Sequence, residues 1–184
     1  MNPIHLRNLP PPIETFKHTE FFQFMFSWLK PECYLELGTR DCLNFQTLAK
    51  LCTKAIGVDI SPIRIPLENN MEFYNMSTDN FFNQLDITIK FDAVFIDADH
   101  SHEQSLKDFM NVKDRIIEDG FIFFHDTYPY DPEYFNPSIC NNVYLTALYI
   151  KQNFIEEFEI LTLPFNPGVT IVKKMKRNKQ LIYT

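Results

Sequence analysis

Glycine is scarce in this sequence: there are four among 184 residues, and they lie far apart. Loops that wrap a dinucleotide pyrophosphate or a nucleoside triphosphate need several neighbouring glycines, because the backbone must approach the phosphates closely. Neither G-x-G-x-x-G nor G-x-x-x-x-G-K-[ST] occurs anywhere in the chain. The sequence therefore disfavours an NAD(P) site of the usual kind and a P-loop.

Three further features are missing. No apolar stretch is long enough to span a bilayer. Positive charge is in deficit, with a net charge of −7, whereas proteins that grip nucleic acid rely on Lys and Arg. The four cysteines form no C-x-x-C pair, and the N-terminus lacks the basic-then-apolar order of a secretory signal. We expect a cytoplasmic protein with reduced thiols, no membrane association and no nucleic-acid partner.

The length suits one domain with one substantial core. Three consecutive prolines at 10–12 oppose a regular helix, so we expect an N-terminal arm over residues 1–18, a single domain over 19–176 and a tail over 177–184. Short apolar runs predict strands at Cys33–Leu37, Lys54–Ile60, Met71–Met76, Phe91–Ile96, Gly120–His125, Phe158–Leu163 and Val169–Lys173. Helical spacing and caps predict helices from Thr19 to Pro31, over Asn44–Cys52, from Thr78, from Ser101 or His102 to near Ile117, and over Asn141–Asn153.

Helices alternate with nearly continuous apolar strands, which is typical of a parallel sheet covered on both faces. The last two strands are joined by a Pro- and Gly-containing turn with no helix between them, which indicates a hairpin. The predicted fold class is α/β: a Rossmann-like, seven-stranded, mostly parallel sheet with helices on both faces and a C-terminal antiparallel hairpin.

Ligands of open parallel sheets bind beyond the carboxyl ends of the strands. The residues expected there are acidic and polar: Glu36 with Gly38-Thr39-Arg40, Asp59, Ser77–Asp79, Asp97-Ala98-Asp99-His100, and His125-Asp126-Thr127. Asp59 follows the strand next to the first loop, where its carboxylate can accept hydrogen bonds from both hydroxyls of a ribose. Alternatively, it can cap a helix beginning near Pro62. A glycine-poor loop beside this acid suits a nucleoside without phosphates, and S-adenosylmethionine is such a nucleoside.

These segments resemble the class I S-adenosylmethionine-dependent methyltransferases, in the small branch with E-L-G-T-R and I-D-A-D-H-S segments. The resemblance is carried by Tyr34–Arg40, Gly57–Asp59 and Phe91–His102. It implies that Glu36 and the backbone at Gly38 hold the amino-acid end of the cofactor, Asp59 the ribose, and Ser77 to Asp79 the adenine. Thr39, Arg40 and Asp97 complete the expected cofactor-binding set. One position departs from the branch: Cys42 stands where a glycine or other small residue is usual.

Asp97 and Asp126 follow strands predicted to be neighbours, so two carboxylates can converge on one divalent cation, with Mg²⁺ favoured by its preference for oxygen. The positions also resemble the D-A-D-K and D-N pairs of metal-dependent, catechol-type O-methyltransferases. In that comparison Asp97 and Asp126 match metal ligands, Thr127 replaces an asparagine and His100 a lysine. His100, with Asp97, is the expected catalytic pair, with the imidazole as general base.

Structural roles compete with these assignments. Asp97 and Asp99 can cap the helix near Ser101, His102 can be a solvated first-turn residue, and His125 can be a core histidine that donates to a backbone carbonyl. The aromatic side chains after the fifth strand can form an acceptor pocket or a lid, or can pack their loop onto the domain. They are Tyr128, Tyr130, Tyr134 and Phe135.

The expected function is S-adenosylmethionine-dependent methyl transfer, of EC 2.1.1 type, to an oxygen of a small-molecule acceptor, assisted by a divalent cation. A homodimer is compatible with this reading. The alternative is a non-catalytic S-adenosylmethionine- or nucleotide-binding module that acts with a partner. An NAD-dependent oxidoreductase is weakened by the single-glycine first loop.

Overall fold

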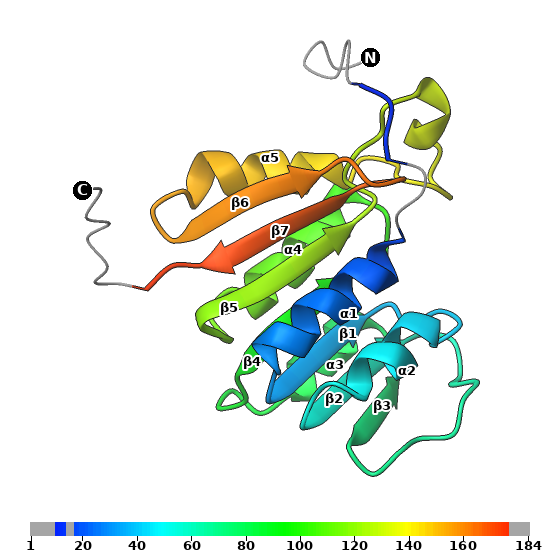
Figure 1. Cartoon of the computed structure of the whole chain (residues 1–184), viewed down its shortest axis with the longest axis vertical. Coiled ribbons are helices and arrows are strands. Elements are labelled where there is room, and N and C mark those ends of the chain that lie inside the picture. The colour runs from blue at the N-terminus through cyan, green and yellow to red at the C-terminus, as the bar shows by residue number, and fades with distance from the viewer. Residues whose placement is uncertain (1–9, 14–16, 177–184) are drawn as a thin grey trace.

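The computed structural model describes residues 10–13 and 17–176 (Figure 1). Its helices are α1 (His18–Leu29), α2 (Leu43–Ala49), α3 (Thr78–Gln84), α4 (His102–Val112) and α5 (Tyr144–Asn153), with a 3-10 helix, η2, over Pro132–Phe135. Its strands are β1 (Cys33–Leu37), β2 (Lys54–Asp59), β3 (Met71–Asn75), β4 (Phe91–Ile96), β5 (Ile116–His125), β6 (Phe158–Leu163) and β7 (Val169–Lys174).

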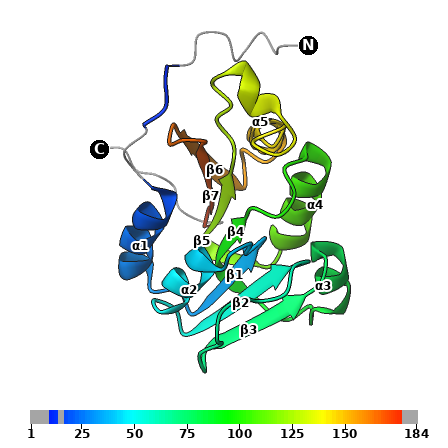
Figure 2. The ribbon, with the colours of Figure 1, turned by 90° about the vertical axis from the view of Figure 1, so that its right-hand side faces the viewer.

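All seven strands form one sheet in the order β3-β2-β1-β4-β5-β7-β6. The first five pair in parallel, and β7 runs antiparallel to both β5 and β6. Helices α1 and α2 cover one face of the sheet, and α3, α4 and α5 cover the other (Figure 2). The predicted fold class is confirmed, including the C-terminal hairpin.

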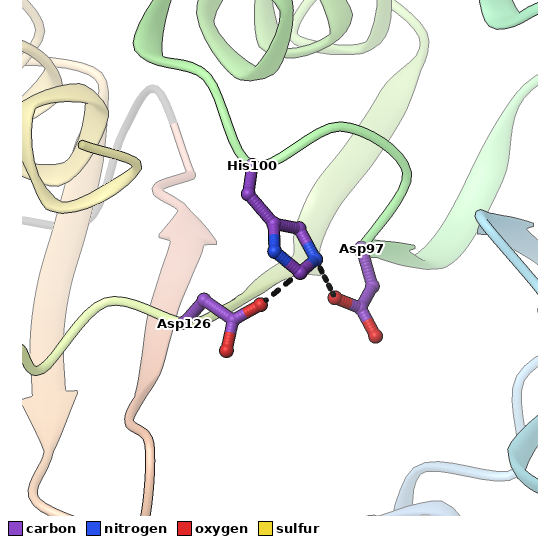
Figure 3. A group of neighbouring side chains, drawn as sticks. All are labelled: Asp97, His100 and Asp126. Carbon is purple, nitrogen blue, oxygen red and sulfur yellow. Dashed lines mark ion pairs between the residues drawn. The ribbon is translucent and has the colours of Figure 1, made fainter. Parts of the chain in front are cut away.

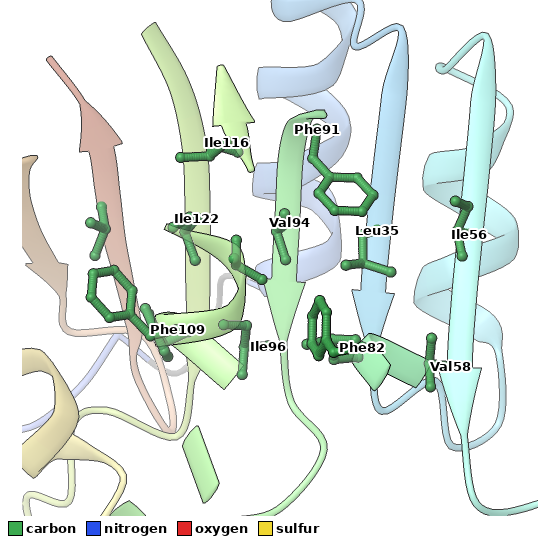
Figure 4. Close-up of a cluster of buried hydrophobic side chains, with 14 of the residues drawn as sticks. Leu35, Ile56, Val58, Phe82, Phe91, Val94, Ile96, Phe109, Ile116 and Ile122 are labelled. Carbon is green, nitrogen blue, oxygen red and sulfur yellow. The ribbon is translucent and has the colours of Figure 1, made fainter. Parts of the chain in front are cut away.

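The parallel register places apolar side chains of neighbouring strands side by side. Leu35 of β1 pairs with Ile56 of β2 and with Val94 of β4, which in turn pairs with Ile122 of β5. These side chains, with Phe109 of α4, belong to the buried cluster in Figure 4. A second cluster, which contains Phe22, Phe45 and Phe123, lies under α1 and α2. Both faces are therefore packed, which leaves the strand ends as the place for ligands.

The expected helix that ends near Ile117 is wrong at its C-terminal end. Helix α4 stops at Val112, and Ile116 already pairs with Phe91 of β4. The register then shifts, so that Ala93 pairs with Phe121 and the intervening residues bulge out. Isoleucines suit a strand as well as a helix, because β-branched side chains favour extended backbone.

Two expected helix caps lie one or two residues from the observed ones. Lys17 precedes α1, and the hydroxyl of Thr19 instead donates to Asn44 Oδ1 at 3.1 Å. Ser77, rather than Thr78, caps α3 by accepting from the backbone N–H of Asn80. Most of the predicted arm and the whole predicted tail lie outside the described residues, so the domain boundaries stay predictions.

Within the described residues, none of the helices has the length and apolar character needed to cross a bilayer.

Candidate functional site at the carboxyl ends of the strands

Three adjoining cavities lie at the carboxyl edge of the sheet, and Gly38 borders all of them. This is where β1, flanked by β2 and β4, marks the reversal of strand order, the usual ligand position in open α/β sheets. The first cavity lies toward β3 and α4, the second toward α1 and α2, and the third toward the loop after β5. The structure thus brings the sequence-predicted residues of five strand ends to one groove.

Gly38 is required by its surroundings. Its φ is +85°, and a Cβ there would lie 2.2 Å from the carbonyl oxygen of Asp97.

Cys42, the departure from the expected pattern, also has a positive φ, of 63°, and its side chain is buried. Glycine adopts this left-handed conformation without steric cost, whereas other residues rarely do. A glycine would therefore suit the conformation observed at Cys42.

Glu36 lies at the floor of the second cavity with 1% of its surface exposed. Its Oε2 accepts hydrogen bonds from the Tyr34 hydroxyl and, at 2.9 Å, from Asn44 Nδ2. Burial raises the pKa of Glu36 to about 8, although both hydrogen bonds oppose that rise. The carboxyl group therefore holds a proton at neutral pH and can release it to receive a cationic group.

Asp59 connects two loops through backbone hydrogen bonds. Its Oδ2 accepts from the N–H of Arg40 at 2.7 Å and its Oδ1 from the N–H of Ser61 at 2.7 Å. No helix follows at Pro62, so the capping alternative is wrong. Asp59 borders the first and third cavities, and its remaining lone pairs can accept from ribose hydroxyls.

The first cavity has apolar walls from Val58, Ile60, Met76 and Ala98. Polar groups stand around it, and the predicted Ser77 and Asp79 are among them. The Asp79 carboxylate is already engaged, because Lys107 Nζ pairs with one oxygen and Gln104 Nε2 donates to the other at 3.2 Å. The sequence did not indicate Gln104 as a residue of this site. The only local sign is its spacing, because a polar residue four positions before Asp108 on a helix can contact that acid.

Asp97, His100 and Asp126 form one cluster at the ends of β4 and β5 (Figure 3). His100 Nε2 lies 3.1 Å from an oxygen of Asp126 and 3.7 Å from one of Asp97. Asp126 is 3% exposed and is held at a φ of 58°. Strained backbone of this kind tends to occur at functional sites. The structure therefore brings the predicted catalytic and metal-binding residues together.

His125 also joins this cluster, and its expected bond to a backbone carbonyl is wrong. Its Nδ1 lies 3.3 Å from a carboxylate oxygen of Asp97 and 3.3 Å from one of Asp126. Burial lowers the pKa of His125, but the two carboxylates outweigh burial and raise it to about 10. The side chain is an imidazolium at neutral pH, so it offsets part of the negative charge of both acids.

Two other histidines differ from expectation. His102 is not simply solvated, because its ring Nδ1 lies 2.8 Å from the Thr146 hydroxyl. His18, placed in the arm by the sequence, begins α1 and meets the ring of His125 edge-on, with centroids 4.4 Å apart. Burial and the neighbouring His125 lower the pKa of His18 to about 4, so its imidazole is neutral. No local pattern around His18 distinguishes it from a surface residue.

The donor set fits a divalent cation. Asp97, His100 and Asp126 each offer one ligand atom, and these atoms all lie within 4.8 Å of one another. Thr127 follows Asp126 in the sequence, and its hydroxyl is buried with no hydrogen-bond partner among the described residues. A set that mixes carboxylates with imidazole suits Mn²⁺, Fe²⁺ or Zn²⁺ as well as Mg²⁺.

The aromatic side chains after β5 mainly fasten their loop. The hydroxyl of Tyr128 donates to the carbonyl of Pro10 at 3.0 Å, and that of Tyr134 to Asn166 Oδ1 at 2.9 Å. The third cavity is bordered on this side by Ser138, Ile139 and Pro167. The packing alternative is thus the one that the structure shows for these two tyrosines.

Comparison with known proteins supports the same fold and places the chain in a family. Residues 22–127, more than half of the chain, match the family described as a methyltransferase domain. No curated protein matches.

Solved structures similar to the chain include three methyltransferases. The SAH-bound methyltransferase PaMTH1 of Podospora anserina is 14% identical, with a TM-score of 0.67 over 86% of this chain and 78% of that one. An O-methyltransferase of Bacillus cereus in complex with SAH is 14% identical, with a TM-score of 0.65 over 91% and 84%. TomG, an O-methyltransferase of Streptomyces achromogenes in complex with SAM, is 13% identical, with a TM-score of 0.62 over 92% and 84%. Identities this low bear on the fold alone.

Proposed function

This chain belongs to the methyltransferase domain family, and from that premise we propose that it transfers the methyl group of S-adenosylmethionine to an oxygen of a small-molecule acceptor. One observation carries the proposal: the groove that contains Glu36 and Asp59 runs directly into the Asp97–His100–Asp126 cluster. Asp97 borders both parts. Three structurally similar methyltransferases, named above, were solved with SAH or SAM.

Methyl transfer from a sulfonium is an in-line displacement, so the protein contributes orientation and electrostatics rather than covalent chemistry. Glu36 would receive the cofactor ammonium, and Asp59 the ribose hydroxyls. His100 stands where it can take the proton of an acceptor hydroxyl. Asp97 and Asp126 would hold a divalent cation, which lowers the pKa of an acceptor hydroxyl when bound.

The test is methyl transfer from labelled S-adenosylmethionine to a panel of phenols, catechols and sugar alcohols by the full chain. We expect turnover on at least one acceptor, and a loss of about 100-fold or more in kcat/KM for Asp97→Asn and for His100→Gln. Asp114→Asn, at an exposed residue just beyond the C-terminus of α4, is the matched control and should keep wild-type turnover.

Parallel assays with EDTA, Mg²⁺ or Mn²⁺ test the cation. Wild-type rates in both D97N and H100Q would contradict the proposed site. Tight binding of SAH without methylation of any acceptor would favour a cofactor-binding module that acts with a partner.

A further inference from the structure

Gln104 of α4 occupies an unusual position in the first cavity. It is half-buried, lies on the first full turn of the helix and lines the cavity together with several apolar residues. A cavity lined by apolar side chains and one amide can bind a planar heterocycle, which packs against the apolar side chains and presents a polar edge to the amide.

The orientation of this amide is fixed by its neighbours. Gln104 Nε2 lies 3.0 Å from the Thr78 hydroxyl, 3.2 Å from Asp79 Oδ1 and 3.2 Å from Asp108 Oδ1, so its two N–H groups are shared among three acceptors. An ionised carboxylate accepts hydrogen bonds and donates none. Reversing the amide would therefore turn its oxygen toward two carboxylates, so the nitrogen must face the protein interior.

Burial of Asp108 strengthens this constraint. The residue is fully buried, and its Oδ2 has no hydrogen-bond partner within the part of the chain that the structure describes. Burial raises the pKa of Asp108 to about 6, while hydrogen bonding with Thr78 and Gln104 opposes the rise. At neutral pH the carboxylate thus remains mostly ionised and needs the donor that Gln104 supplies. Losing that donor would leave a buried charge with less stabilisation.

The consequence appears on the opposite side of the amide. Among the described residues, the hydrogen bonds of the Gln104 side chain all involve Nε2, so Oε1 is the acceptor that this residue can offer to the cavity that it lines. Adenine carries an exocyclic amino group, a donor, at position 6, whereas hypoxanthine and guanine carry an oxygen acceptor there.

We propose that Gln104 determines base specificity: its Oε1, fixed by Asp79 and Asp108, accepts a hydrogen bond from the 6-amino group of the cofactor adenine and rejects 6-oxopurines. This inference rests on the proposed function, because it assumes that the groove binds an adenosine cofactor. It assigns the base-reading role to a residue outside the segment Ser77 to Asp79 that the sequence indicated.

The experiment compares SAH with S-inosylhomocysteine, in which the 6-amino group is replaced by an oxygen, by isothermal titration on the full chain. The wild-type protein should bind SAH about ten-fold more tightly or better, since one unmatched polar contact weakens binding by about that factor. In Gln104→Leu and Gln104→Ala the preference should fall to about two-fold or less. Gln152→Leu, on the exposed side of α5, is the matched control and should keep the full preference.

A variant of Asp108 provides a second test of the same proposal. Asp108→Asn removes one of the two carboxylates that hold the amide and can itself present an N–H₂ group to Gln104, so the reversed amide, which offers a donor to the cavity, becomes more favourable. Its preference for SAH should therefore shrink while the melting temperature stays within a few degrees of the wild type. A merely structural role would lower the melting temperature and leave the preference intact.

The outcomes separate the two proposals. If the wild type binds SAH but not with preference over S-inosylhomocysteine, or if both Gln104 variants keep the preference, the role of Gln104 is overturned and the proposed function stands. If the folded wild type binds neither ligand, the proposed function is overturned and the role of Gln104 falls with it. Three variants, Gln104→Leu, Gln104→Ala and Asp108→Asn, address the same preference, so the failure of one to fold leaves the others to decide.

Discussion

The carboxyl group of Glu36 combines burial with two hydrogen-bond donors and an open path to a cavity. In the free protein its pKa is raised to about 8, because burial disfavours the ionised form. A cationic ammonium placed against it would favour ionisation. Binding of the cofactor should therefore expel the proton.

This coupling predicts the pH dependence of binding. With a free-state pKa of about 8 and a bound-state pKa below 6, the affinity for SAH should rise about 50-fold from pH 6 to pH 8. Titrations in buffers of different ionisation enthalpy should show release of nearly one proton per SAH at pH 7. Glu36→Gln should bind weakly with little pH dependence.

Glu72, exposed on β3, offers the matched control. Glu72→Gln should keep the full pH dependence. An affinity of the wild type for SAH that is constant between pH 6 and pH 8 would contradict the assignment of Glu36 to the ammonium.

Glu36, Asp59, Asp97 and Asp126 could be identified from the sequence because each lies at or near the end of an apolar run, and strand ends of a parallel sheet share one edge. The side chains that contact these acids and their neighbours could not be identified in this way. His18 meets His125 across more than one hundred residues of chain, and Gln104 meets Asp79 through the packing of α4 beside α3. Such contacts depend on helix placement, which leaves no local pattern.

Helix α1 shows, at the scale of an element, the same difference between what the sequence predicts and what depends on packing. A phenylalanine-rich stretch such as Phe21 to Phe26 is typical of a helix packed on a core, and Phe22 and Phe26 are indeed fully buried. Phe24, however, is 63% exposed. Successive helical residues turn by about 100°, so residues two apart face nearly opposite sides. The helix is visible in the sequence, whereas the buried part of its surface depends on the sheet beneath it.

This difference predicts a matched pair of stability effects. The ring centroid of Phe22 lies 5.1 Å from that of Phe95 and 4.8 Å from that of Phe123. Phe22→Ala should lower the free energy of unfolding by about 3–5 kcal/mol, because it removes a buried ring and leaves a cavity. Phe24→Ala should change it by about 0.5 kcal/mol or less. Urea denaturation measures both, and equal losses would contradict the observed orientation of α1.

At the scale of the whole molecule, the fold class followed from the alternation of helices and strands, and the hairpin from a turn without a helix. The order of the strands in the sheet cannot be predicted from that alternation. It places β1 between β2 and β4 and thereby creates the groove, so residues from Glu36 to Asp126 meet only after the complete parallel sheet has formed.

A ligand of this groove should therefore bind the native state and stabilise the entire chain. SAH at 100 times its Kd should raise the free energy of unfolding by about 2.7 kcal/mol, by mass action alone. NAD⁺ should have no effect, because the single glycine of the first loop provides no pyrophosphate cradle. Urea denaturation with each ligand measures this.

Asp59→Asn provides the control within the protein. Its amide can accept only through one oxygen, so it cannot serve Arg40, Ser61 and a ribose as the carboxylate does. At the same SAH concentration, the stabilisation of this variant should fall by about 1 kcal/mol or more, whereas Asp114→Asn should keep the wild-type value. Stabilisation by NAD⁺ equal to that by SAH would instead favour a dinucleotide-binding protein.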